Sequence, residues 1–249
     1  MRTKLVLVAI VVAVTAMAST SASASAATAA SGAKASSTAP TRHLRTFAAN
    51  ASLMVTSSAS SDPGFSFSAK SVFVGPSKQD CTVHGAVGGL HLSEHGIVIG
   101  KHVWSDEGSG FKNARLADLY GQFMCGSSEA FWKSLPFGSP PSGLTGTSDT
   151  INGIKSTKYD LSNAASSLTS TGLLSSVPSG VSVTTLIVAY GGSNRWVDLF
   201  DLSATGASAT ACSKMTQGST LTPPCTFVIH VDVAKPNSGT LHVRAPSTK

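Results

Sequence analysis

Apolar residues that recur at every second position between residues 181 and 233 constrain the fold most. From Cys225 to Val233 they alternate with more polar residues, which makes one side of an extended strand apolar. The runs Val181–Tyr190 and Arg195–Leu202 flank a Gly-Gly-Ser-Asn turn, as in a β-hairpin. We predict a further strand from Ala207 to Met215. A sheet of this kind must cover its apolar face with a helix, a second sheet or a ligand.

The chain before residue 181 predicts more strands and three helices. Residues 41–58 have apolar side chains at helical spacing, at Leu44, Phe47, Ala48, Ala51 and Val55. The other expected helices are Ser127–Leu135 and Ser162–Gly180. The expected strands are 65–74, 82–92 and 97–104, the last two forming a hairpin around Ser93–Gly96, then 155–161 after an Asn152-Gly153 turn, and finally 241–246 after a polar turn at 235–239.

The N-terminus predicts export. Arg2 and Lys4 precede an apolar run, Leu5–Val14, that is too short to span a bilayer, which is typical of a secretion signal. We therefore expect residues 1–26 to be a signal peptide, with an uncleaved membrane anchor as the alternative. Residues 27–40 form a flexible Ala/Ser/Thr linker. Residues 41–249 then form a single domain of a secreted or envelope-associated protein.

An even number of cysteines after a signal peptide indicates disulfides. Cys212 and Cys225 flank a presumed turn, so we predict the pairs Cys212–Cys225 and Cys81–Cys125. Their spacing does not fit a zinc site, because the chain has no C-x-x-C motif.

The charge of the chain limits its partners. The formal net charge is +6, but the basic residues are scattered and aromatic residues are few. This pattern predicts no nucleic-acid binding, because a phosphate-tracking stripe is missing. A mild attraction to an anionic cell envelope is compatible with it.

Chemistry-bearing motifs are sparse. His84, His91, His95 and His102 cluster in sequence, and the expected hairpin would let two or three of them bind a metal beside Glu94. Histidines near a turn on the surface explain the same pattern, so we predict no metal and no cofactor. The chain has no G-x-S-x-G elbow, and nothing marks the carboxylate pairs Asp106/Glu107 and Asp198/Asp201 as catalytic. We therefore expect no enzymatic activity.

Apolar strand residues are the remaining candidates for a site. Six of them are expected to share one side of the sheet: Phe65, Phe67, Phe73, Phe227, Ile229 and Val231. An ordinary core and a cavity for an apolar ligand both require such a face, and periodicity does not separate them.

Several segments resemble the actinobacterial LppX/LprG-type lipid-carrier lipoproteins, whose fold is a LolA/LolB-like half-barrel. In chain order the matching segments are Phe65–Val74, Ser127–Lys133, Ile151–Leu161, Leu186–Phe200 and Leu241–Pro246. The lipobox cysteine of that family is missing here. The resemblance implies a curved antiparallel sheet with a ligand in its hollow.

We therefore expect an α+β protein, in which helices pack across the concave face of a curved antiparallel β-sheet. The expected function is non-enzymatic binding or carriage of a lipid or other amphipathic small molecule at the cell envelope, by a monomer. The alternatives are a secreted, disulfide-bonded structural or interaction module without a ligand cavity, and a secreted hydrolase.

Overall fold

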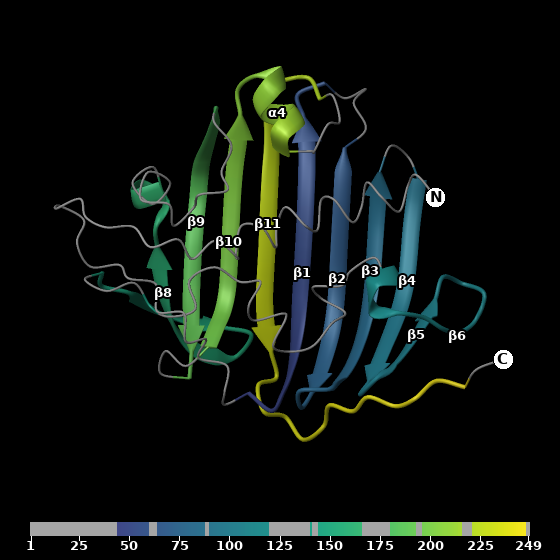
Figure 1. The fold of residues 1–249 in the computed structure, drawn as a ribbon. Helices are drawn as coiled ribbons and strands as arrows, with labels where there is room; N and C mark the ends of the chain where they lie inside the picture. Colours follow the sequence, from purple (N-terminus) through teal and green to yellow (C-terminus); the bar gives the residue numbers. More distant parts are fainter. Residues whose placement is uncertain are drawn as a thin grey trace, which may run out of the picture.

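The structure, a computed structural model, describes residues 44–59, 64–87, 90–119, 140, 144–165, 180–192, 196–215 and 221–247. Their strands form one antiparallel sheet (Figure 1), in the order β6-β5-β4-β3-β2-β1-β11-β10-β9-β8-β7. The strands are β1 (Thr46–Ser57), β2 (Phe65–Val74), β3 (Lys78–Val87), β4 (Leu90–Ile99), β5 (His102–Asp106), β6 (Lys112–Asn113), β7 (Thr147–Ile151), β8 (Ile154–Asp160), β9 (Val181–Gly191), β10 (Trp196–Gly206) and β11 (Cys225–Ala234). The helical elements are the 3-10 turns η2 (Leu116–Asp118) and η3 (Ser162–Ala164) and the α-helix α4 (Ala209–Met215).

One pairing joins the two halves of the sheet. Strands β1 to β6 follow one another as neighbours, as do β7 to β10, and β11 returns to lie between β1 and β10. The register pairs Ala51 of β1 with Val231 of β11 on one side and with Ala69 of β2 on the other. The first and last strands of the chain therefore lie side by side in the middle of the sheet (Figure 1).

The alternation predicted for the strands is confirmed where it was strongest. In β11 every odd-numbered residue from Cys225 to Val233 is buried, and the residues between them are half-buried. In β2 the odd-numbered residues Phe65, Phe67 and Phe73 are buried in the same way. The hairpin of β9 and β10, the turn at Asn152-Gly153 and the strand that follows it are confirmed as well.

The predicted helix over residues 41–58 is wrong, because most of it is strand β1. Phe47, Ala51 and Val55 are four residues apart, which fits both a helix face and one side of a strand. Ala49 and Leu53, which lie between these residues in sequence, are also buried, so every second residue is buried as in a strand.

The predicted turn at Ser93–Gly96 is also wrong, because β4 runs straight through it. Gly96 is needed there for space: a Cβ atom would lie 3.0 Å from Cys81 Sγ and 3.3 Å from Leu119 Cδ1. The turn to β5 lies at Gly100 and Lys101.

Two segments predicted as strands have other structures. The Ala207–Met215 run forms helix α4, where the backbone N–H of Ala211 donates to Ser208 Oγ at 3.2 Å in an N-terminal cap. Residues 241–246 follow the expected polar turn as an extended segment outside the sheet.

The predicted fold class is wrong in its helical part. Among the described residues, helix is confined to α4 and two 3-10 turns, and a large open antiparallel sheet accounts for most of the structure. The expected helix Ser127–Leu135 lies outside the described residues, and only the start of Ser162–Gly180 is described, as η3. No helix in the described ranges is long and apolar enough to cross a membrane.

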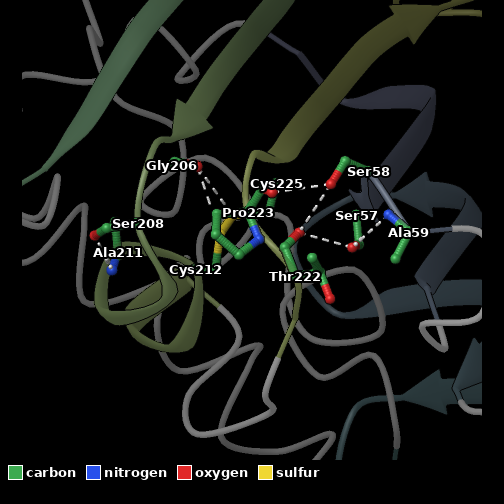
Figure 2. Close-up of a disulfide and its surroundings, with 10 residues drawn as sticks. All are labelled: Ser57, Ser58, Ala59, Gly206, Ser208, Ala211, Cys212, Thr222, Pro223 and Cys225. Carbon is green, nitrogen blue, oxygen red and sulfur yellow. Dashed lines mark hydrogen bonds between the residues drawn. A yellow bond between two sulfur atoms is a disulfide. The ribbon is translucent and has the colours of Figure 1, made fainter.

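The predicted disulfide Cys212–Cys225 is confirmed and joins α4 to the start of β11 (Figure 2). The residues just before Cys225 are also held by the end of β1: Ser57 Oγ donates to the carbonyl oxygen of Thr222 at 2.8 Å, and Ser58 Oγ to that of Pro223 at 2.9 Å. Cys81 is disulfide-bonded. Its predicted partner Cys125 lies outside the described residues, so that pairing stays a prediction.

Replacing both Cys212 and Cys225 by serine should lower the free energy of unfolding by about 3 kcal/mol, because the bond closes a loop whose entropy is then restored to the unfolded chain. Urea unfolding of the two proteins under non-reducing conditions measures the difference. Ser213→Ala, next to the disulfide in α4, is the control. An unchanged midpoint in the double variant would show that the bond adds no stability.

Candidate functional site

One side of the sheet is a continuous apolar face that extends from β4 to β8. Its residues are buried and belong to eight neighbouring strands in the sheet order. We call it the apolar face; it consists of Val98, Val83, Phe65, Phe67, Ala69, Phe73, Phe47, Ala49, Ala51, Leu53, Val55, Phe227, Ile229, Val231, Val233, Phe200, Leu202, Leu186, Val188, Tyr190 and Tyr159.

All six sequence-predicted candidates lie on this face. The register places Val55 between Phe65 and Phe227, and Leu53 between Phe67 and Ile229. Val231 lies next to Ala51, while Phe73 pairs with Phe47 towards the other end of the strands. Each of the six is less than 8% exposed. The prediction that they share one face is therefore confirmed, whereas their role as ligand contacts stays a prediction.

A band of small side chains crosses the apolar face. In register order it runs through Ala49, Ser71, Cys81 and Gly96, on four neighbouring strands. Larger side chains lie at both ends of the band's strands; at one end the rings of Phe47 and Phe73 stack with their centroids 4.4 Å apart. Leu119 packs onto Gly96 and fills part of the band with the protein's own side chain.

Among the strands that the structure describes, one acid lies on this side of the sheet. Glu94 is buried beside its cross-strand neighbour Val83, and Ser105 Oγ donates a hydrogen bond of 2.6 Å to Glu94 Oε1. The sequence placed Glu94 in a turn near the surface. Its burial was missed because the predicted turn interrupted the alternation of β4.

Of the four clustered histidines, His91 and His95 do not flank the predicted hairpin turn, because β4 is continuous through both, and the three histidines of β3 and β4 lie on the side of the sheet opposite the apolar face. His95 Nε2 lies 2.8 Å from Asp80 Oδ1, and the ring of His102 stacks on Trp104. His84 and His91 are exposed. Within the described ranges, no group of three or more His, Cys, Asp or Glu side chains is placed to hold a metal ion.

The side of the sheet opposite the apolar face carries a charged network that the sequence did not reveal. His230 lies between two carboxylates, with Nδ1 2.5 Å from Asp201 Oδ1 and Nε2 3.1 Å from Asp232 Oδ2. The side-chain amides of Asn50 and Asn152 donate to Asp232 Oδ1 at 2.9 and 2.7 Å. The only signal in the sequence was that Asp201, His230 and Asp232 occupy outward positions of apolar strands.

The network shifts the charges of its members. The carboxylates of Asp201 and Asp232 raise the pKa of His230 to about 10, so the ring is protonated at neutral pH. Burial acts to raise the pKa of Asp232, but the hydrogen bonds from His230 and the two asparagines outweigh it and lower that pKa. Both ring nitrogens of His230 are engaged, so the ring has none left to take a proton from a substrate.

Asp198 is an acid buried beside this network. It is the extra residue of a bulge in β10, has no exposed surface, and accepts a 2.5 Å hydrogen bond from Ser156 Oγ of β8. Burial raises its pKa to about 6, against the opposing effect of the hydrogen bond from Ser156. The ring of Trp196 lies over Gly192, which has a φ of 57° and whose Cβ would lie 2.1 Å from that ring.

These contacts argue against Asp198 and Asp201 as the two catalytic carboxylates of a glycosidase. Asp198 is fully buried and bonded to Ser156 of β8, while Asp201 is held by His230 on the next strand. Two carboxylates that hydrolyse a glycoside must face one another across an accessible cleft. The described geometry instead gives both acids structural partners.

Comparisons with known proteins leave the function open. No family model matches the chain, and no curated protein sequence matches it. Among solved structures, LprF from Mycobacterium bovis is similar at a TM-score of 0.31 and 9% identity, covering 82% of this chain and 90% of that one. A LolA superfamily protein, NE2245 from Nitrosomonas europaea, is similar at a TM-score of 0.28 and 7% identity, covering 82% and 88%. Similarity at this level carries no argument about ligand or activity.

Asp198→Asn should stabilise the protein more at pH 7 than at pH 4. Because the folded-state pKa of about 6 exceeds the ordinary 3.8, the contribution of Asp198 is fully present below 3.8 and is lost as the pH rises through 6. The variant stays neutral at that position. The difference between its free energy of unfolding and that of the wild type should therefore rise by up to about 3 kcal/mol as the pH increases from 3.8 to 6. Urea unfolding at both pH values tests this, with the exposed Glu107→Gln as control. A pH-independent difference would contradict it.

His230→Gln should remove part of the loss of stability at alkaline pH. The raised pKa means that the contribution of His230 is complete below its ordinary 6.5 and is lost as the pH passes about 10. The ring is partly exposed, so solvent screening reduces the effect and only its direction is predicted. Denaturant unfolding at pH 7 and 10 should show a smaller advantage of wild type over His230→Gln at the higher pH. The exposed His84→Gln is the control, and an advantage that grows with pH would refute the assignment.

Proposed function

We propose that the apolar face binds a lipid or another amphipathic small molecule, and that the protein carries this ligand without chemically changing it. The width of the apolar face supports this most directly, because its residues come from eight neighbouring strands of a single sheet. The α-helix of the described residues, α4, lies at one end of the sheet beside the disulfide (Figure 1).

The chemistry of the face fits an amphipathic guest better than a purely apolar one. Most of it is aliphatic or aromatic, which favours acyl chains through the hydrophobic effect. The Glu94–Ser105 pair adds buried polar atoms beside Val83. A ligand with one polar group and an apolar body would match both parts.

The proposed location is the cell envelope or the extracellular space. The N-terminal secretion signal predicted from the sequence supports export, and the disulfide Cys212–Cys225 is a bond that persists in oxidising compartments. A carrier at that location would exchange its lipid ligand between its own apolar face and a membrane.

Mass spectrometry of organic extracts tests the proposal. The chain is purified from its exported fraction without detergent, and we expect a lipid in near-stoichiometric amount, or its uptake after incubation with envelope lipid extract. A second exported, disulfide-bonded protein purified in parallel is the control. If neither the purified nor the incubated protein yields lipid, the binding function is wrong, and the disulfide-bonded structural module remains.

Two matched substitutions locate the ligand. Ala51→Leu enlarges a residue in the middle of the apolar face, whereas Met54→Leu changes a 46% exposed residue on the opposite side of the same strand. Overpacking costs about 1–3 kcal/mol, so we expect Ala51→Leu to weaken ligand binding roughly tenfold. Met54→Leu should bind as the wild type does. Thermal unfolding shows that both variants are folded, and equal binding by both would place the ligand elsewhere.

A further inference from the structure

Six basic residues of the described segments lie at one end of the sheet. At this end β1, β3, β5, β8 and β10 begin, and β2, β4, β7, β9 and β11 finish. The described segments there are 44–46, 74–78, 99–102, 151–155, 191–192 and 234–247, and none of them contains Asp or Glu. Six basic residues lie in them, and we call this set the basic rim: Arg45, Lys78, Lys101, Lys155, Lys235 and Arg244.

The basic rim is exposed and electrostatically uncompensated. All six side chains are exposed, and none forms an ion pair with a carboxylate of the described residues. The lysine further along β8, Lys158, is in contrast paired with Asp149 at 3.0 Å. Cations that have no internal partner are available to an external anion.

The turns that carry the basic rim are bonded to one another. The backbone N–H of Gly75 donates to the carbonyl oxygen of Arg45, and that of Gly100 donates to Ser77 at 2.8 Å. On the other side, the N–H of Arg45 donates to Asn237 Oδ1 at 2.7 Å. Neighbouring strands are about 4.8 Å apart, so the row from β11 to β4 is a preorganised platform on the order of 20 Å wide.

Two further segments are held at the same end. Asn152, at the tip of the hairpin that leads to Lys155, donates to the carbonyl oxygen of Val233 at 3.1 Å. The segment that carries Arg244 runs along the strand ends (Figure 1) and is anchored by the buried Val243. The backbone segments that carry the basic rim are therefore fixed relative to one another.

The geometry points to the basic rim as a docking surface for an anionic lipid membrane. Its charge is of one sign, its width matches several headgroups, and the apolar face ends directly behind it, at Phe47, Phe73 and Val233. A lipid leaving the apolar face along the strands would emerge at this rim. The inference rests on the proposed function, for which it names the membrane surface that exchanges ligand with the protein.

Vesicle flotation with the full exported chain tests this docking. Vesicles of phosphatidylcholine with about 30 mol% phosphatidylglycerol should bind the protein, and vesicles of phosphatidylcholine alone should not. Binding should be lost near 1 M salt, where the screening length is only about 3 Å. Equal binding to both kinds of vesicle would overturn the inference. So would binding to soluble polyglutamate without binding to the anionic vesicles, because the partner would then be an acidic polymer.

Two triple variants of equal charge change separate the basic rim from net charge. Lys78→Gln, Lys101→Gln and Lys235→Gln remove three rim cations, while Lys70→Gln, Lys112→Gln and Arg115→Gln remove three exposed cations elsewhere. Each rim charge should be worth about fivefold, so the rim variant should bind anionic vesicles roughly 100-fold more weakly. The control variant should bind within a few-fold of wild type. Equal loss in both would show that overall charge, not the rim, drives binding.

The ligand content of the same variants separates the two proposals. If the rim variant keeps its extracted lipid but loses vesicle binding, both proposals are supported. If lipid is found and the rim variant still binds vesicles as wild type does, the docking inference fails alone. If vesicles bind through the rim and no lipid is ever found, the carrier function fails, and the rim is no longer an exchange surface.

Discussion

The antiparallel pairing of β1 with β11 is the interaction on which the rest of the structure depends. It joins strands from opposite ends of the described chain at ten paired positions, from Ala48–Ala234 to Ser57–Cys225. Closing so long a loop costs chain entropy, which must be offset by burial of apolar surface along both strands. Without this pairing the sheet would separate into β1–β6 and β7–β11, and the apolar face would be split through its middle.

Polar contacts between β1 and β11 specify the register of their pairing. Asn50 and Asp232 are paired in the ladder and hydrogen-bonded through their side chains at 2.9 Å. Slipping β11 by one residue would turn Asp232 and His230 onto the apolar face, where their charges would be desolvated without partners. The charged network thus stabilises one alignment of two strands whose apolar side alone would tolerate shifts of two residues. Its role is structural, which is why its shifted pKa values do not indicate catalysis.

Strands with strict alternation could be predicted from the sequence, and segments whose apolar spacing fits two periods could not. Phe65, Phe67, Phe73, Phe227, Ile229 and Val231 were placed correctly on one face, because their neighbours in sequence are more polar. Residues 41–58 were assigned to a helix because Phe47, Ala51 and Val55 satisfy both periods. Gly96 was taken for a turn residue, although its role is to admit Leu119 and Cys81 from the same face. The charged network depends on which strands are neighbours, and no local pattern contains that information.

The band of small side chains bears on how a carrier could release its ligand. Leu119 already occupies the space above Gly96, so a guest at that position must displace a side chain of the protein itself. The affinity is then the difference between two sets of apolar contacts, and it is smaller than the gross burial of the guest. Such competition makes release possible without a chemical step, provided that the released lipid meets an acceptor at once. A rigid basic rim at the end of the same strands would bring such an acceptor close, because it holds that end of the apolar face against an anionic membrane. Leu119 would then return to the space that the ligand leaves.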